Sequence, residues 1–366
     1  MPTRYRPASD GVRRATVVGG GSFGTAVAVL LVRARVRTTL LCRTEEQTDA
    51  LCAARENERY LDGVELPGEL KIRTLGARED QFSRPDLIFL AVPSKGLADA
   101  IVEIGALGIS DGAGLVSLAK GLVAPDGNVP TVELEHAFGP ERVACVGGPA
   151  HAKEMVESGA GLVCASHSEV LVHRVAETFQ RSGVVCEVSD DPVGAELAGV
   201  AKNAAAVAVG ATQSQGLNAA GMAAADIFLE VLALAEVGGG RARTFVGRAG
   251  TGDLVATALA PESRNRSAGE LLAEGVPAAE IPDRLGQAVE ALETVRLLAR
   301  AIERGGLEAP VTSALAHLID GELPLERWIE MVRAKQPAPA RFGPATVWAR
   351  IRAWFRRRRE RRDTRG

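Results

Sequence analysis

A run of glycines near the start of the chain constrains its fold more than any other feature of the sequence. Gly19, Gly21 and Gly24 have GxGxxG spacing, after a short apolar β-branched run and before a helix-like run. In a strand–turn–helix unit the first glycine permits a tight turn, the second lets backbone approach a pyrophosphate, and the third allows close helix–strand packing. Together with Ser22 and Phe23, which lie between them, the glycines therefore predict a dinucleotide-binding site.

Short β-branched runs and helix-like stretches alternate from this turn to about residue 190. Such alternation is typical of βαβ units and so of a mostly parallel sheet covered by helices. Beyond Asp190-Asp191-Pro192 the chain is rich in Ala, Leu and Glu and shows no strand pattern. The expected strands are Ala15–Val18, Thr38–Cys42, Leu87–Val92, Leu115–Leu118 and Val143–Val146, with Gly161–Ala165 and Val184–Val188 extending the sheet.

These patterns predict an α/β fold with two domains, which a chain of 366 residues can supply with two cores. Residues 14–190 are expected to form a Rossmann-type dinucleotide-binding domain with a doubly wound, mostly parallel sheet. Residues 191–332 are expected to form a second, all-helical C-terminal domain that binds the substrate, whereas the polar residues 1–13 are expected to be poorly ordered. Ligands of such folds bind beyond the carboxyl ends of the strands, so the substrate is expected in the cleft between the domains.

The composition is that of a soluble globular protein, with 46% hydrophobic and 24% charged residues. Five scattered cysteines without CxxC spacing argue against a disulfide framework or a zinc site, and no metal is expected. Arg13-Arg14 and the apolar run after them resemble the start of a signal peptide, but the glycines in that run fit a strand, turn and helix better. We therefore predict a cytoplasmic protein.

The C-terminal tail has a charge opposite to that of the rest of the chain. Residues 333–366 contain 12 basic and two acidic residues, net +10, whereas the other residues carry 31 basic and 44 acidic ones, net −13. Trp348, Ile351 and Trp354 recur at helical spacing among arginines, a pattern suited to the surface of an anionic membrane. Three hypotheses for the tail remain. Membrane contact through residues 345–366 and a solvated tail are the main two, and nucleic acid binding is a weaker third.

The residue after the second expected strand bears on the choice of cofactor. NAD enzymes usually have an acidic residue there for the ribose hydroxyls, but this chain has Arg43. A guanidinium suits a 2′-phosphate through forked hydrogen bonds, which favours NADP(H), with NAD(H) as the alternative. An exposed loop arginine without a ligand would look the same in the sequence.

Several segments, in this order, resemble the bacterial NAD(P)-dependent glycerol-3-phosphate dehydrogenases from about Ala15 to about Glu326. The ordered set is more specific than any one fragment, and its most specific part is Ala249–Leu254 followed by Ser263–Arg266. The other segments are Gly19–Ala26, Asn57–Leu61, Ala91–Ser94, Ser117–Leu122, Gly148–Glu154 and Glu196–Asn203.

The resemblance implies a reaction, the reduction of dihydroxyacetone phosphate to sn-glycerol 3-phosphate for phospholipid synthesis. By position, Lys202 matches the family's catalytic lysine. Lys120 matches a residue that contacts substrate and cofactor, and Asp253 matches one that orients a lysine. An ammonium can stabilise the developing alkoxide and give it a proton. Lys202 also lies in an apolar helix-like run, where an unpaired charge would be costly to bury.

The same resemblance implies further ligands. Arg264 matches a residue that binds the substrate phosphate and part of the cofactor; Ser263 and Asn265 would add neutral donors, although both residue types also favour helix caps. Ala152 and Glu290 match positions near the cofactor, and Glu290 could equally be a charge on an exposed helix face. The remaining implied substrate contacts are Gly148, Ala150 and Asn203.

Two departures from the family pattern concern the substrate. Ala150-His151 replace the usual hydroxyl residue and Phe, and the segment Asn218–Glu230 lacks the usual basic residue near its end. They keep open the reduction of another small 2-keto compound, or a catalytically weak NADP(H)-binding sensor or scaffold. A homodimer and a small phosphorylated substrate are the expected partners.

Overall fold

The computed structural model describes residues 5, 7, 11–77, 81–260 and 263–334. Its main element is an eight-stranded sheet with the order β10-β9-β8-β7-β6-β1-β2-β5. Neighbouring strands are parallel except β8 and β9, which run antiparallel. The predicted doubly wound, mostly parallel sheet is therefore confirmed. The strands of the sheet are β1 (Arg14–Val18), β2 (Arg37–Cys42), β5 (Lys71–Thr74), β6 (Leu87–Leu90), β7 (Gly114–Ser117), β8 (Val143–Gly147), β9 (Gly161–Ala165) and β10 (Val185–Ser189).

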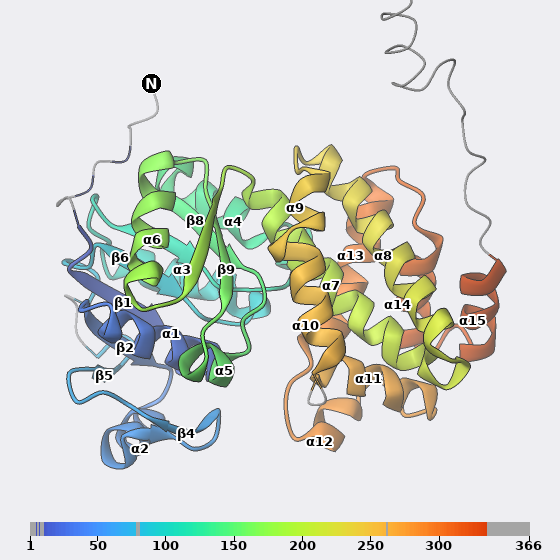
Figure 1. Ribbon diagram of the computed structural model, residues 1–366, viewed down its shortest axis with the longest axis horizontal. Helices are drawn as coiled ribbons and strands as arrows, with labels where there is room; N and C mark the ends of the chain where they lie inside the picture. Colours follow the sequence, from blue (N-terminus) through green and yellow to red (C-terminus); the bar gives the residue numbers. More distant parts are fainter. Residues whose placement is uncertain (1–4, 6, 8–10, 78–80, 261–262, 335–366) are drawn as a thin grey trace, which may run out of the picture. The chain divides into compact units, whose positions relative to one another are not determined.

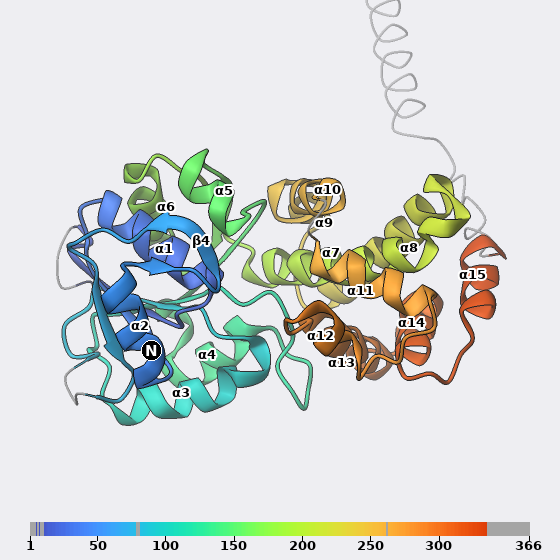
Figure 2. The same ribbon diagram turned by 90° about the horizontal axis from the view of Figure 1, so that it is seen from below.

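Helices cover both faces of this sheet, because consecutive strand residues point to opposite sides. Leu87 and Phe89 of β6 pack into the core under α1 and α6, whereas Ile88 and Leu90 pack into the core under α3 and α4. Figures 1 and 2 show these two helix layers. The helices associated with the sheet are α1 (Ser22–Arg33), α2 (Glu45–Ala54), α3 (Leu97–Ala106), α4 (Pro130–Phe138), α5 (Ala152–Glu157) and α6 (Glu169–Arg181).

Three short strands and one residue near the start of the chain depart from the sequence prediction. The edge strand β5 and the small hairpin of β3 (Glu56–Asn57) and β4 (Leu61–Glu65) were not expected, because their alternation spans only a few residues. Tyr5 corrects the prediction for residues 1–13, since its side chain is buried and its hydroxyl accepts a hydrogen bond from Arg174.

Only helices follow Ser189 in the part of the chain that the structure describes, as the sequence predicts. Two of them, α7 and α8, have 21 residues each. None of the described helices is both long and apolar enough to cross a membrane. The predicted tail contact at residues 345–366 lies outside the described residues. The helices are α7 (Pro192–Thr212), α8 (Leu217–Val237), α9 (Ala242–Val246), α10 (Asp253–Leu259), α11 (Arg264–Ala273), α12 (Ile281–Leu285), α13 (Glu290–Arg304), α14 (Pro310–Ile319) and α15 (Leu325–Ala334).

Helix α7 packs unusually closely on α11. A Cβ atom at Gly210 of α7 would lie 2.0 Å from the carbonyl oxygen of Arg266, and one at Gly269 of α11 would lie 2.0 Å from that of Val207. Any side chain at these glycines would therefore force the helices apart. The contact fixes α11, which begins with Arg264, against the helix that carries Lys202.

Candidate functional site

The turn between β1 and α1 has the geometry of a phosphate-binding loop. Gly19 has φ +114°, and a Cβ atom there would lie 2.4 Å from the carbonyl oxygen of Ala91 at the end of β6. A Cβ at Gly24 would lie 2.1 Å from the Gly19 carbonyl oxygen, so α1 can approach the strand only with glycine at this position. A Cβ at Gly21 would meet no protein atom within 4 Å, and no side chain caps α1. The free amide groups and the open space beside them fit a dinucleotide pyrophosphate.

Two amide side chains hold this turn from outside. The carbonyl oxygen of Gly20 accepts hydrogen bonds from Gln47 Nε2 at 2.8 Å and from Asn57 Nδ2 at 3.1 Å. Asn57 is buried and also donates to Thr25 Oγ1 at 2.7 Å. Asn57 belongs to a segment that resembles the family but has no predicted role, and no sequence signal marks Gln47, because only the fold brings it to the turn.

Three predicted catalytic residues meet where the ends of the strands approach the helical region. Lys120 follows β7, Lys202 lies in the middle of α7, and Asp253 begins α10. Asp253 Oδ2 lies 2.8 Å from Lys120 Nζ and 3.7 Å from Lys202 Nζ. Lys120 Nζ also donates to the carbonyl oxygen of Gly148 at 3.1 Å and lies 5.9 Å from the centre of the Phe23 ring. One carboxylate therefore holds two ammonium groups beside the glycine-rich turn.

Burial changes the proton affinity of this cluster. Burial and, to a smaller extent, the charge of Lys120 lower the pKa of Lys202, whereas Asp253 opposes the shift, and the resulting pKa is about 8. Burial alone would raise the pKa of Asp253, but the charges of Lys120 and Lys202 outweigh that effect and bring it below its usual value. The cluster can thus keep its carboxylate charged while one buried lysine gives up a proton near neutral pH.

A chain of amide hydrogen bonds joins the two lysines to α11. Asn203, next to Lys202, donates from Nδ2 to the carbonyl oxygen of Lys120 at 2.8 Å. Its Oδ1 accepts a hydrogen bond from Asn265 Nδ2 at 2.9 Å. The structure therefore brings the predicted substrate residues Lys120, Lys202, Asn203 and Asn265 together.

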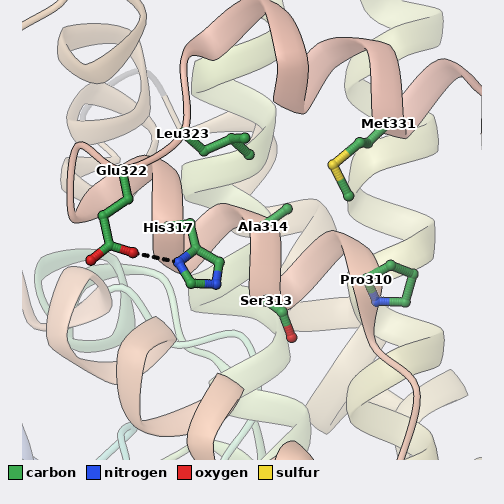
Figure 3. Close-up of a pocket in the computed structure, with 7 residues that line it drawn as sticks. All are labelled: Pro310, Ser313, Ala314, His317, Glu322, Leu323 and Met331. Carbon is green, nitrogen blue, oxygen red and sulfur yellow. Dashed lines mark hydrogen bonds and ion pairs between the residues drawn. The ribbon is translucent and has the colours of Figure 1, made fainter.

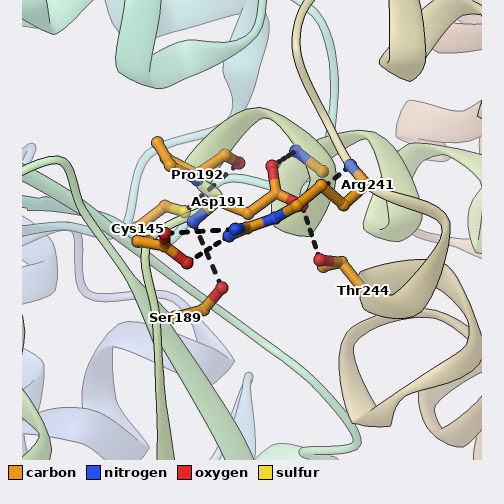
Figure 4. A network of polar contacts seen from close by, with 8 residues as sticks. Cys145, Ser189, Asp191, Pro192, Arg241 and Thr244 are labelled. Carbon is orange, nitrogen blue, oxygen red and sulfur yellow. Dashed lines mark hydrogen bonds and ion pairs between the residues drawn. The ribbon is translucent and has the colours of Figure 1, made fainter.

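The start of α7 is fixed by a buried carboxylate (Figure 4). Asp191 caps the helix by accepting a hydrogen bond from the Gly194 amide at 2.8 Å. Its other oxygen accepts hydrogen bonds from the Arg241 amide at 3.0 Å and from Thr244 Oγ1 at 2.5 Å. The carboxylate thus ties the first turn of α7 to the start of α9, and so sets where the helix that carries Lys202 begins.

Arg264 and Glu290 begin two neighbouring helices beside the cluster. Burial raises the pKa of Glu290, and the positive charge of Arg264 opposes that shift. Glu290 is half-buried, so the interpretation as a charge on an exposed helix face is wrong. Arg264 is exposed and donates to Gln287 Oε1 at 3.2 Å. Ser263 is buried and accepts a hydrogen bond from the Arg266 amide at 3.4 Å, so its hydroxyl caps α11.

Comparisons with known proteins agree with this geometry. Residues 14–171 match the model of the family described as NAD-dependent glycerol-3-phosphate dehydrogenase N-terminus, and residues 191–330 match that of its C-terminus. A glycerol-3-phosphate dehydrogenase of Parafrankia is 33% identical over 90% of this chain and 99% of its own length. The chain belongs to the NAD-dependent glycerol-3-phosphate dehydrogenase family.

Other members of the family support the same assignment. A glycerol-3-phosphate dehydrogenase of Azotobacter vinelandii is 34% identical over 88% of this chain and 94% of its own length. The crystal structure of glycerol-3-phosphate dehydrogenase from Coxiella burnetii aligns with a TM-score of 0.81 at 26% identity, over 89% of this chain and all of that one. The proteins named Glycerol-3-phosphate dehydrogenase (NAD(P)+) favour the first of the predicted functions over its alternatives.

Other predicted ligands lie at the edge of the site in this member of the glycerol-3-phosphate dehydrogenase family. Arg43 is exposed directly after β2, as a ligand for a ribose phosphate would need to be. Ala150 and Ala152 are half-buried against the core of the sheet region. His151 is exposed between them, and its charge is among those that lower the pKa of Asp253, although burial, Lys120 and Lys202 have larger effects.

A separate hollow of about 420 Å³ lies in the helical region (Figure 3). At one end His317 Nδ1 lies 2.7 Å from Glu322 Oε2. The hollow shares no residue with the lysine cluster, so it does not belong to the candidate active site. Its lining residues are Pro310, Ser313, Ala314, His317, Glu322, Leu323 and Met331.

Proposed function

We propose that this protein reduces dihydroxyacetone phosphate to sn-glycerol 3-phosphate with NADPH or NADH, and so supplies the backbone of glycerophospholipids. The observation that carries the proposal is the buried cluster of Lys120, Lys202 and Asp253 at the carboxyl end of the sheet. A protein that only binds a dinucleotide has no need for two lysines that share one carboxylate. The names of the relatives, glycerol-3-phosphate dehydrogenases, point to the same reaction.

Lys202 is proposed as the proton donor. Its ammonium, with a pKa lowered to about 8 by burial, can give a proton to the oxygen of the C2 carbonyl as that oxygen becomes negative. Lys120 polarises the same carbonyl, and Asp253 keeps both ammonium groups in place. When bound, the nicotinamide supplies the hydride.

The substrate phosphate is assigned to the start of α11. Arg264 provides a forked guanidinium, and its exposed side chain is free to reach a ligand beside the cluster. Asn265 donates a hydrogen bond to Asn203, next to Lys202 on α7, and from there its amide would add a neutral donor for the phosphate. Ser263 contributes by fixing the first turn of α11. Gly148 and Ala150 complete the proposed substrate side.

For the cofactor we propose a preference for NADP(H). Gly19–Gly24 would hold the pyrophosphate, with Ser22 and Phe23 beside it, while Ala152, Arg264 and Glu290 would lie along its length. Arg43 would bind the 2′-phosphate, because no acidic residue stands at that point and its side chain is exposed. Arg43→Ser is expected to raise the KM for NADPH about 10-fold and leave that for NADH unchanged. Equal changes for both cofactors would contradict this role.

The proposed reaction is tested by following the oxidation of NADPH, and separately of NADH, with dihydroxyacetone phosphate and with a panel of other 2-keto compounds. Dihydroxyacetone phosphate is expected to give the highest kcat/KM. A higher value for a carboxylated or unphosphorylated compound would move the assignment to that substrate. Binding of NADPH without turnover of any compound would favour the sensor or scaffold.

For the tail we propose reversible contact with anionic membrane through residues 345–366, on an otherwise cytoplasmic enzyme. The basis is the charge of +10 and the aromatic residues at helical spacing in the sequence. Deleting residues 340–366 is expected to abolish co-sedimentation with vesicles that contain phosphatidylserine and to leave turnover unchanged. Unchanged co-sedimentation would refute the contact, and retention on nucleic acid would assign the tail to that partner instead.

We also propose a homodimer. Helix α8 exposes Met222 and Leu229, which are 42% and 63% exposed and lie two turns apart on one face. A second copy of the chain is the proposed cover for this face. Analytical ultracentrifugation of Leu229→Arg is expected to yield monomers where the unmodified protein yields dimers.

A further inference from the structure

Helix α7 carries a second buried ionisable side chain, Glu196, which the proposed reaction does not use. It is 5% exposed, and its two carboxyl oxygens accept hydrogen bonds from the Thr131 amide at 3.2 and 3.1 Å. Thr131 Oγ1 donates to one of them at 2.5 Å. Val129, before the first turn of α4, provides no side-chain cap. Glu196 therefore caps α4 from another helix.

The same carboxyl group is linked to the turn that carries Lys120. The Ser117 hydroxyl, at the end of β7, lies close enough to Glu196 to lower the pKa of its carboxyl group. Ser117 Oγ also accepts a hydrogen bond from the Ala119 amide at 3.3 Å, directly before Lys120. Ser117 thus connects Glu196 to the backbone next to a proposed catalytic lysine.

One face of α7 lies beside this turn at three positions, each one helical turn from the next. A Cβ atom at Gly199, one turn after Glu196, would lie 3.9 Å from Lys120 Cγ, and Asn203, a further turn along, donates to the Lys120 carbonyl oxygen. Lys202 lies beside Asn203 on the same helix. The position of α7 along the turn therefore sets the position of Lys202 relative to Lys120.

We propose that Glu196 is a positioning residue that fixes the Lys120 turn in register with Lys202 through its hydrogen bonds with Thr131 and its contact with the Ser117 hydroxyl. The inference rests on the proposed function, because it assigns a role within that reaction. A shift of the turn by about 1 Å is enough to cost about 100-fold in rate when reacting groups must align.

The protonation state of the Glu196 carboxyl group shows which substitution of this residue is conservative. Burial and, to a smaller extent, the charge of Glu135 on α4 raise the pKa of Glu196, whereas the hydrogen bonds from Thr131 and the nearby Ser117 hydroxyl oppose the shift, and the resulting pKa is about 8. The buried thiol of Cys145 on β8 also lies close enough to interact with it. The side chain is thus mostly uncharged at neutral pH, and glutamine has the same shape and keeps an acceptor for Thr131.

The molecule contains a matched control for the loss of stability. Glu230 of α8 is also 5% exposed and caps a helix that begins with proline. Its carboxyl group accepts hydrogen bonds from the Val311 amide at 3.2 Å, the Thr312 amide at 2.8 Å and Thr312 Oγ1 at 2.7 Å. The hydrogen bonds and ion pairs of the lysine cluster involve neither Val311 nor Thr312. Removing Glu230 therefore costs a similar set of bonds without moving the Lys120 turn.

The experiment compares Glu196→Ala, Glu196→Gln and Glu230→Ala by steady-state kinetics with NADPH and dihydroxyacetone phosphate and by thermal unfolding. Both alanine variants are expected to lose Tm to a similar extent. Only Glu196→Ala should lower kcat, by about 100-fold, with the KM for NADPH changed less than about threefold. Glu196→Gln should restore kcat to within about threefold of the unmodified protein, because its amide oxygen still accepts a hydrogen bond from Thr131.

Equal kcat values for the two alanine variants would overturn the proposal, as would a failure of Glu196→Gln to restore kcat. If Glu196→Ala does not fold, Ser117→Ala removes only the link to the turn and should lower kcat about 10-fold; an unchanged kcat would overturn the proposal. Should the unmodified protein show no turnover, the proposed function fails on its own. Hydrogen exchange of residues 117–121 then decides the positioning role, and it should speed up in Glu196→Ala but not in Glu230→Ala.

Discussion

The two lysines of the site share one carboxylate but differ in their surroundings. Lys120 lies in a turn after a strand, with 21% of its side chain exposed, and contacts Asp253 at 2.8 Å. Lys202 lies in the middle of a buried helix, with 10% of its side chain exposed and its Nζ 3.7 Å from the same oxygen. The more buried lysine thus has the weaker contact with the carboxylate.

This difference suits the two lysines to the two tasks that we propose for them. Burial lowers the pKa of Lys202 to about 8, so it can exchange a proton near physiological pH. Lys120 keeps a close ion pair and a hydrogen bond to the Gly148 carbonyl oxygen, which suits a fixed positive charge that orients substrate. Two residues of one type can therefore act as donor and as anchor, because solvent reaches them unequally.

Removing the donor is expected to have the largest effect. Lys202→Ala should lower kcat about 10⁴-fold, because proton transfer and charge stabilisation are both lost, while the Kd for NADPH stays within about threefold. Turnover and fluorescence titration with NADPH measure the two quantities. A kcat within 10-fold of the unmodified protein would assign the proton to another group.

Removing the anchor is expected to cost less. Lys120→Ala should lower kcat about 100-fold and raise the KM for dihydroxyacetone phosphate, because the substrate loses a contact in both ground and transition states. Steady-state kinetics with varied substrate measure both changes. If Lys120→Ala and Lys202→Ala gave the same loss in kcat and no change in KM, the division of tasks would be wrong.

The pH dependence of the rate should follow the buried lysine. Reduction needs the Lys202 ammonium, so kcat is expected to fall about 10-fold per pH unit above pH 8, whereas oxidation of glycerol 3-phosphate needs the neutral amine and should rise to a plateau there. Because the charge of Lys120 helps to lower the pKa of Lys202, Lys120→Ala should move this fall in kcat to higher pH. If kcat begins to fall at the same pH in Lys120→Ala, the charges of the two lysines are not coupled.

The smallest expected effect concerns stability. The folded pKa of Lys202, about 8, lies below its ordinary value of 10.5, so the unfolded chain binds more protons between these pH values. Stability therefore rises with pH across this window, by on the order of 3 kcal/mol from this group. Urea unfolding of the unmodified protein and of Lys202→Met at pH 7.5 and 10 measures the difference. Parallel changes in the two proteins would mean that Lys202 is not desolvated.

Local sequence patterns determined the elements and their class. The glycines from Gly19 to Gly24 and the β-branched runs predicted the parallel sheet, because backbone freedom and side-chain alternation act over a few residues. The strand β5 at the edge of the sheet was missed, since it spans four residues and its pairing with β2 depends on the fold. The antiparallel direction of β9 left no trace in the sequence either, because a strand has the same alternation in both directions.

For the candidate site, the sequence named Lys120, Lys202 and Asp253 through their motifs, but not the contacts that relate them. Asp253 and Lys120 are 133 positions apart in the chain, and only the tertiary structure brings them to 2.8 Å. Burial is likewise a property of the assembled core, so the lowered pKa of Lys202 and the capping role of Glu196 could not be read from residue types. The sequence determined which chemical groups the protein has, and the packing of distant segments decided which of them share a proton, a charge or a hydrogen bond.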